Sequence, residues 1–363
     1  MSRLPKLFEK PSFRSVTARN RIVVSPMCQY SAHEGLGTDW HVQHLGARAF
    51  GGAGIVFTEA TSVSALGRIT HGCLGLWTDE QQAFMARLVQ LIESAGAVPG
   101  MQIAHAGRKA SSQRPWEGGG PIAEEDGGWL PWAPSAIPFV EGATIPHVMS
   151  IADIQTVIGE FRDTARRARL AGLKVLEVHG AHGYLGHSFL SPISNTRTDQ
   201  YGGSLANRAR FLIETVEAIR EDWPDDLPLF VRLSCTDWMP VGLMMEDAVQ
   251  VAKMLKATGK VDLIDASTGG ILAKGPVIPS LHPGYQVPYA EAVRGGAEIA
   301  TGAVGLITAP EHAEEIIGNG RADLVFLARA LLVDPYWPLR AAHVLGAPQD
   351  IPLQYQRAGF GRR

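Results

Sequence analysis

Apolar and polar residues alternate along this chain with two different periods, and segments of the two kinds follow one another from end to end. Short β-branched and aliphatic runs, which are typical of buried strands, occur at residues 22–26, 54–59, 99–104, 174–179, 229–233, 262–266, 299–303 and 323–328. Segments with apolar residues three and four positions apart predict helices at residues 79–95, 150–172, 204–223, 246–257, 289–294, 311–317 and 336–345. The pattern therefore predicts a chain of strand–helix units.

Eight strands alternating with helices in 363 residues favour an α/β fold, a closed parallel (β/α)8 TIM barrel, over an open doubly wound sheet. An open dinucleotide-binding sheet carries a glycine-rich turn after its first strand, but this strand ends in Ser25-Pro26-Met27-Cys28-Gln29. We predict a single domain over residues 1–363. It has an N-terminal extension at 1–21, a rim loop or lid at 107–149, and a C-terminal tail at 348–363.

Composition excludes several classes of function. The formal net charge of -3 and the pI near 6.5 give no basic surface for nucleic acid. No apolar run approaches membrane-spanning length, and the basic N-terminus lacks the apolar core of a secretory signal. The 3 cysteines, without a C-x-x-C pair, argue against a disulfide framework and against an iron–sulfur cluster. We therefore expect a cytoplasmic protein.

The chemistry is predicted to centre on Val178-His179-Gly180-Ala181-His182-Gly183-Tyr184, which follows the fourth strand. Strand side chains alternate between faces, so the two imidazoles converge only where the strand stops, near Val178, and the glycines bend the chain. Such a pair could hold and polarise one carbonyl oxygen. Two other interpretations stay open: structural histidines, and a zinc site with His105 or Glu177 as a further ligand.

Other strand ends carry polar residues at the face where barrel enzymes place their active sites. Gly305 and Arg329, after the last two strands, match a phosphate pocket, although a turn glycine and a surface ion pair would look the same. Arg232 is a charge at the end of a buried strand, which suits either an anionic ligand or a core ion pair. Gln102 can both donate and accept, as a heterocyclic imide edge requires. Together these residues fit flavin mononucleotide.

Motifs at several separated positions occur in order along the chain: Ser25-Pro26-Met27-Cys28-Gln29-Tyr30, His105-Ala106-Gly107-Arg108-Lys109-Ala110, His179-Gly180-Ala181-His182-Gly183-Tyr184-Leu185, Arg197-Thr198-Asp199-Gln200-Tyr201-Gly202-Gly203-Ser204 and Asn207-Arg208. In sequence and order they resemble the old yellow enzyme family, and in particular its bacterial, thermophilic-like branch, which includes xenobiotic reductases. The resemblance runs from about Phe8 to the C-terminal tail, so it is highly specific.

The resemblance implies a flavoprotein with bound FMN that is reduced by NADPH and then reduces activated C=C bonds in enones, enals, maleimides or nitroalkenes. It implies that the cofactor contacts are Ser25, Pro26, Met27, Cys28, Ala60, Gln102, Arg232, Gly305, Ala328 and Arg329. It also implies that His179 and His182 bind the substrate carbonyl beside Tyr30, and that Tyr184 donates the proton. No metal is expected.

The C-terminal Gln354-Tyr355-Gln356-Arg357 is similar to a segment that, in this branch, reaches into the site of a neighbouring subunit. The resemblance therefore implies a homodimer or a dimer of dimers in which Arg357 contacts the neighbour's substrate. At Ala328-Arg329 the chain departs from the family's usual Gly-Arg, and an added methyl matters if that backbone needs a positive φ. The segment 107–149 is longer than in the shortest relatives.

Two further functions can be considered from the sequence. The first, a flavin enzyme acting on a dienoyl thioester, would need an iron–sulfur cluster and extra domains, which the cysteines and the length do not allow. A barrel without flavin would be either a metal hydrolase built on His105, His179 and His182 or a binding module. The colour of the purified protein would separate these possibilities.

Overall fold

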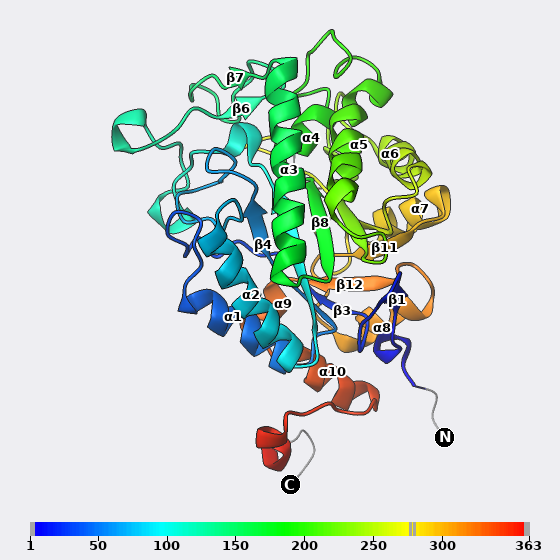
Figure 1. Ribbon diagram of the computed structural model, residues 1–363. Helices are drawn as coiled ribbons and strands as arrows, with labels where there is room; N and C mark the ends of the chain where they lie inside the picture. Colours follow the sequence, from blue (N-terminus) through cyan, green and yellow to red (C-terminus); the bar gives the residue numbers. More distant parts are fainter. Residues whose placement is uncertain (1–3, 276–277, 279–280, 359–363) are drawn as a thin grey trace.

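The computed structural model describes residues 4–275, 278 and 281–358, and in them a closed barrel of parallel strands forms the centre of the molecule (Figure 1). Its strands, in order around the barrel, are β3 (Ile22–Val24), β4 (Ile55–Ser62), β5 (Val98–Ala104), β8 (Val175–Gly180), β9 (Leu229–Ser234), β10 (Leu263–Ser267), β11 (Ala300–Ala303) and β12 (Leu324–Leu327). Each predicted strand overlaps one of these. The predicted (β/α)8 fold is confirmed.

Helices cover the outside of the barrel: α1 (Asp39–Phe50), α2 (Asp79–Ser94), α3 (Ile151–Ala171), α4 (Leu185–Leu190), α5 (Leu205–Asp222), α6 (Met245–Ala257), α7 (Val287–Ala297), α8 (Pro310–Gly318), α9 (Arg329–Val333) and α10 (Trp337–Leu345). The sequence did not predict α1, α4 and α9. In α1 the buried face includes His41, His44 and Arg48, so its apolar period is weak.

Two apolar clusters separate the inside of the barrel from its outside. The larger cluster joins the strands to the helices, and the smaller one gathers alternate strand residues such as Val23, Phe57, Phe230 and Phe326. The hairpin of β1 (Ser12–Phe13) and β2 (Val16–Thr17) packs Phe13 against Phe230, with ring centroids 5.2 Å apart. One end of the barrel is therefore filled with apolar side chains, which leaves the other end for polar ones.

The rim segment 107–149 lies beyond the carboxyl end of β5 and contains short pieces of structure (Figure 1). These are η2 (Gly107–Lys109), η3 (Pro115–Glu117), η4 (Glu124–Asp126), β6 (Trp132–Ala133) and β7 (His147–Val148). The tail ends in η5 (Leu353–Ala358), drawn at the far end of the molecule from β6 and β7. None of the helices within the described ranges is long and apolar enough to span a membrane.

Candidate active site

The turn after β8 brings the two predicted imidazoles and the phenol together. The strand ends at Gly180, one residue beyond the predicted range and two beyond Val178, and then His182 (φ 58°) and Gly183 (φ 75°) adopt left-handed backbone conformations. The rings of His179 and His182 are 5.1 Å apart between centroids, and the rings of His179 and Tyr184 are 4.8 Å apart. The predicted convergence of these three side chains is therefore observed.

Hydrogen bonds to each imidazole define which ring nitrogen is left for a ligand. His179 Nδ1 accepts from the Ala181 N–H at 3.2 Å, so the proton of the neutral ring is on Nε2. His182 Nε2 lies 2.7 Å from the Ser267 hydroxyl. That hydroxyl also reaches Gln286 Oε1, at 3.3 Å, an oxygen that accepts from Thr268 at 2.6 Å. The single proton of Ser267 therefore has two acceptors within reach, and when it is donated to His182 the proton of the neutral His182 ring is on Nδ1.

Both imidazoles are neutral at neutral pH. Burial, followed by the positive charge of Arg232, holds the pKa of His179 and of His182 well below the ordinary value. Burial also raises the pKa of the Tyr184 phenol, so this group keeps its proton. The turn thus presents the N–H of His179, and that of His182 when Ser267 donates to the His182 ring, beside a protonated phenol, a set that can bind an oxygen and deliver a proton.

A buried pair that the sequence did not reveal supports this turn. The His187 ring accepts from the Gly183 N–H at 2.8 Å through Nδ1, and its Nε2 lies 2.9 Å from Asp237 Oδ1. The carboxylate also accepts from the Ser191 hydroxyl at 2.7 Å and from the Leu243 N–H at 2.8 Å. The backbone between His182 and Tyr184 is therefore tied to the loop after β9. The two residues are 50 positions apart, and no local pattern pairs them.

A polar layer lies across the barrel interior below these imidazoles. Gln102 donates to Glu177 Oε1 at 2.7 Å, and Arg232 Nε lies 3.0 Å from Asp265 Oδ2 without the alignment of a hydrogen bond. Arg232 also donates to the Ser25 hydroxyl at 3.3 Å. Arg232 Nε, Glu177 Oε2 and both Asp265 oxygens are buried and have no hydrogen-bond partner in the described chain. Such orphaned groups suit a polar ligand at the barrel mouth.

The predicted phosphate residues lie at the ends of β11 and β12. Gly305 has φ 117°, a conformation that glycine adopts without strain, and a Cβ at this position would lie 2.9 Å from Gln286 Nε2. Arg329 begins α9 and is exposed. Ala328 has φ -110°, so the methyl that replaces the family's glycine causes no left-handed strain. These residues could receive a phosphate group.

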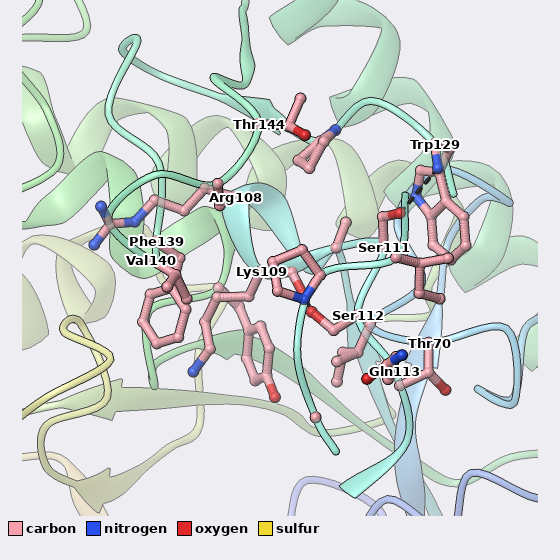
Figure 2. Close-up of a pocket in the computed structure, with 18 of the residues that line it drawn as sticks. Thr70, Arg108, Lys109, Ser111, Ser112, Gln113, Trp129, Phe139, Val140 and Thr144 are labelled. Atoms are coloured by element: carbon pink, nitrogen blue, oxygen red, sulfur yellow. Dashed lines mark hydrogen bonds between the residues drawn. The ribbon is translucent and has the colours of Figure 1, made fainter. Parts of the chain in front are cut away.

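A cavity of about 290 Å³ opens between Tyr30, Tyr184 and the rim segment (Figure 2). Lys109 lies in its wall, with Nζ 4.4 Å from the centroid of the Phe139 ring and 4.9 Å from that of Tyr184. It also donates to the His182 carbonyl at 2.9 Å, and burial lowers its pKa to about 8. Figure 2 shows Arg108 extending away from the other labelled polar side chains. No role for Lys109 was predicted from the sequence.

Of the remaining predicted cofactor residues, most follow β3 and one, Ala60, lies in β4. Pro26, Met27 and Cys28 are partly exposed, whereas Ala60 is buried. Burial, followed by the charge of Glu59, raises the pKa of the Cys28 thiol well above its ordinary value. The Cys28 thiol therefore keeps its proton at neutral pH, which argues against a role as nucleophile.

The alternative of a metal hydrolase has no ligand set in the described residues, which contain no group of three His, Cys, Asp or Glu side chains arranged to hold a metal ion. His105 Nδ1 accepts from the Gly107 N–H at 3.0 Å, and burial lowers the pKa of this imidazole to about 4. Arg357 is exposed in η5 and does not line the cavity of its own chain. The structure of one chain therefore does not bring Arg357 to the other predicted residues.

Comparison with known proteins decides the family. Residues 6–347 match the NADH:flavin oxidoreductase / NADH oxidase family, whose members carry FMN. The chain belongs to this family. It is 50% identical over 353 residues to the NADPH dehydrogenase of Geobacillus sp. (strain WCH70), covering 97% of this chain and 98% of the relative. The resemblance to the old yellow enzymes and the prediction of an FMN-dependent oxidoreductase are thereby confirmed.

Two solved structures of reductases match the fold of this chain. Morphinone reductase matches with a TM-score of 0.78 and 26% identity, over 96% of this chain and 91% of the other. A 2-naphthoyl-CoA reductase matches with a TM-score of 0.85 and 28% identity, over 95% of this chain. The present chain spans only 53% of that reductase.

The residues at the mouth fit the FMN of this flavin oxidoreductase family. The Arg232 guanidinium, whose Nε faces Asp265, would be the cation for the pyrimidine edge of the ring system, and Gln102 lies in the same layer. Gly305 and Arg329 would hold the phosphate, with Ser25, Pro26, Met27, Cys28 and Ala60 along the ring system. The N–H donors of His179 and His182 remain for a substrate.

Proposed function

We propose that this protein is an NADPH-dependent ene-reductase, which reduces the C=C bond of enones, enals, maleimides or nitroalkenes. The convergence of two neutral imidazole donors on one point beside a protonated phenol carries the proposal. The name of the Geobacillus relative supports NADPH as the hydride donor. The cavity of about 290 Å³ beside Tyr184 is large enough for a small cyclic alkene.

FMN, when bound, would supply the hydride chemistry that links oxidation of NADPH to reduction of the alkene at its β-carbon. His179 Nε2–H and His182 Nδ1–H bind the carbonyl or nitro oxygen and stabilise the negative charge that develops on it. Tyr184 donates a proton to the α-carbon, and Tyr30 borders the substrate. Arg232 stabilises negative charge at the pyrimidine edge of the cofactor.

The function is tested by purifying the protein and supplying NADPH and an alkene panel without oxygen. We expect a yellow protein whose colour survives chelation, and NADPH oxidation that is stoichiometric with the saturated product. A colourless protein that loses activity on chelation would instead support a metal enzyme.

A Ser267 variant tests the substrate-binding role of His179 and His182 indirectly, through the hydroxyl that contacts His182. If Ser267 donates to His182 Nε2, as we propose, then replacing Ser267 with alanine removes the hydroxyl that holds the proton of His182 on Nδ1. We expect the barrier to enone reduction to rise by about 1 kcal/mol, because one neutral hydrogen bond is lost. The reaction should therefore be roughly fivefold slower. Stopped-flow rates of the reduced enzyme would measure this effect. A Ser267→Thr variant, which keeps the hydroxyl, should recover most of the rate, and equal rates in all three proteins would contradict the assignment.

Arg357 is proposed to complete the substrate site of a neighbouring subunit in a homodimer or homotetramer. Replacing Arg357 with alanine should raise the KM for an enone at least tenfold with little change in kcat, because a charged hydrogen bond contributes about 1.5–3 kcal/mol. Arg357→Lys is the matched control that keeps the charge.

Mixed oligomers show whether Arg357 acts across subunits. Co-expressing His179→Ala with Arg357→Ala chains should give oligomers in which some sites contain both wild-type residues and have a normal KM. A purely monomeric protein with normal KM for Arg357→Ala would contradict this role.

A further inference from the structure

Two carboxyl groups and one guanidinium group are enclosed in the polar layer inside the barrel. Glu177 and Asp265 have no exposed surface, and Arg232 is 5% exposed. Neighbouring strands hold them in register: Gln102 of β5 pairs with Glu177 of β8, and Arg232 of β9 pairs with Asp265 of β10. Below them lie the aromatic side chains of the barrel interior, so water cannot reach the layer from that end.

The charges in this layer do not balance if both carboxyl groups are ionised. Arg232 forms its ion pair with Asp265, at 3.0 Å. Within the described chain, Glu177 has no cation within ion-pair distance, and its only hydrogen bond comes from the neutral amide of Gln102. An isolated ionised carboxylate in such a place costs several kcal/mol, and a buried group of this kind normally becomes neutral instead.

The electrostatic surroundings of Glu177 also favour its neutral form. Burial raises the pKa of Glu177 to about 8, the charge of Asp265 adds to the effect, and Arg232 opposes it. Burial raises the pKa of Asp265 to about 6, and Arg232 again opposes it. His179, on the same strand as Glu177, is neutral and contributes no charge. These shifts favour the state in which Asp265, beside Arg232, carries the negative charge and Glu177 is neutral.

Glu177 also determines how Gln102 presents its amide. Because the Gln102 NH2 group donates to Glu177 Oε1, its carbonyl oxygen is the atom left to accept a hydrogen bond from a ligand at the barrel mouth. An imide N–H at the edge of a flavin is such a donor. If the Gln102 amide were rotated by a half-turn, its NH2 group would face the imide N–H, and two hydrogen-bond donors would oppose each other.

We propose that Glu177 is a neutral carboxylic acid in the working enzyme and a positioning residue for the flavin, since it orients Gln102 and keeps the layer beneath the cofactor uncharged. This inference rests on the FMN of the family but not on the identity of the alkene. It predicts that a negative charge appears beneath the flavin only when the pH rises through about 8. That charge opposes the anionic reduced cofactor, so the flavin midpoint potential falls more steeply there.

Infrared spectroscopy of the FMN-loaded protein tests the protonation state directly. At pH 7 we expect a protonated-carboxyl C=O band that shifts when glutamate is labelled with ¹³C and disappears in Glu177→Gln. Glu214→Gln is the matched control, since Glu214 accepts from Tyr201 at 2.7 Å on α5, far from the layer. Glu160 is the other described glutamate whose pKa is raised by burial, so a Glu160→Gln variant of the labelled protein assigns the band even if Glu177→Gln does not fold. A spectrum without a glutamic acid band would overturn the proposal.

Spectroelectrochemistry tests the effect on the cofactor. Between pH 7 and 9.5 the midpoint potential of the wild type should fall more steeply than that of Glu177→Gln, which carries no ionisable group at this position. The two proteins should agree at pH 7, and Glu214→Gln should follow the wild type. Parallel profiles for wild type and Glu177→Gln would overturn the proposed charge effect. Neither readout uses an alkene, so a failure of the ene-reductase proposal would leave both results interpretable.

Discussion

Replacing His179 with alanine is expected to slow the reduction of a cyclic enone by roughly 30-fold to 1,000-fold. Removing one donor to a developing oxyanion costs about 2–4 kcal/mol of barrier, and His179 supplies one of the two imidazole donors. The step from NADPH to the flavin should change far less, because no charge develops on an enone oxygen in that half-reaction. Stopped-flow spectroscopy of the two half-reactions measures both rates.

The matched control for this prediction is His147→Ala, a histidine of the rim segment that pairs with Asp153 at 2.9 Å and is remote from the turn. It should leave both rates within about twofold. If His179→Ala had unchanged rates in both half-reactions, His179 would not be part of the substrate clamp.

The second large effect is expected at Arg232. Replacing Arg232 with leucine leaves Asp265 as a buried carboxyl group without a counter-charge, which should lower the free energy of unfolding by about 3–5 kcal/mol. FMN should also be lost during purification, because the cation at its pyrimidine edge is gone. Denaturant unfolding and the ratio of flavin to protein absorbance measure the two effects.

A double variant separates stability from cofactor binding. Arg232→Leu combined with Asp265→Leu replaces the ion pair by apolar groups and should recover most of the stability. It should not recover FMN binding. A double variant that binds FMN like the wild type would show that Arg232 serves the fold and not the cofactor.

The sequence predicted the barrel because each strand is a short apolar run and each predicted helix has a regular apolar period. It did not predict α1, whose buried face carries two histidines, His41 and His44. His41 contacts Glu59 of β4 at 3.2 Å, and a polar contact of this kind leaves no periodic signal. Helices that pack through polar side chains are therefore the ones that pattern analysis misses.

The candidate site was predicted only in part, for similar reasons. Arg232 was identified because a charge on a buried strand needs a partner, and the same rule applies to Asp265 and Glu177 on neighbouring strands. The rule that a charge on a buried strand needs a partner therefore identifies Glu177, Arg232 and Asp265 together, which are the charged residues of the polar layer. His187 and Asp237 lie on different elements and meet only through the fold. Their role could not be inferred from spacing.

One measurement tests the central claim most directly: a single turnover between the NADPH-reduced enzyme and a cyclic enone in the absence of oxygen. We predict that the enone reoxidises the flavin with formation of one equivalent of the saturated ketone, and that His179→Ala slows this step by at least 30-fold. The account would be contradicted if the reduced enzyme were reoxidised by oxygen but not by any activated alkene.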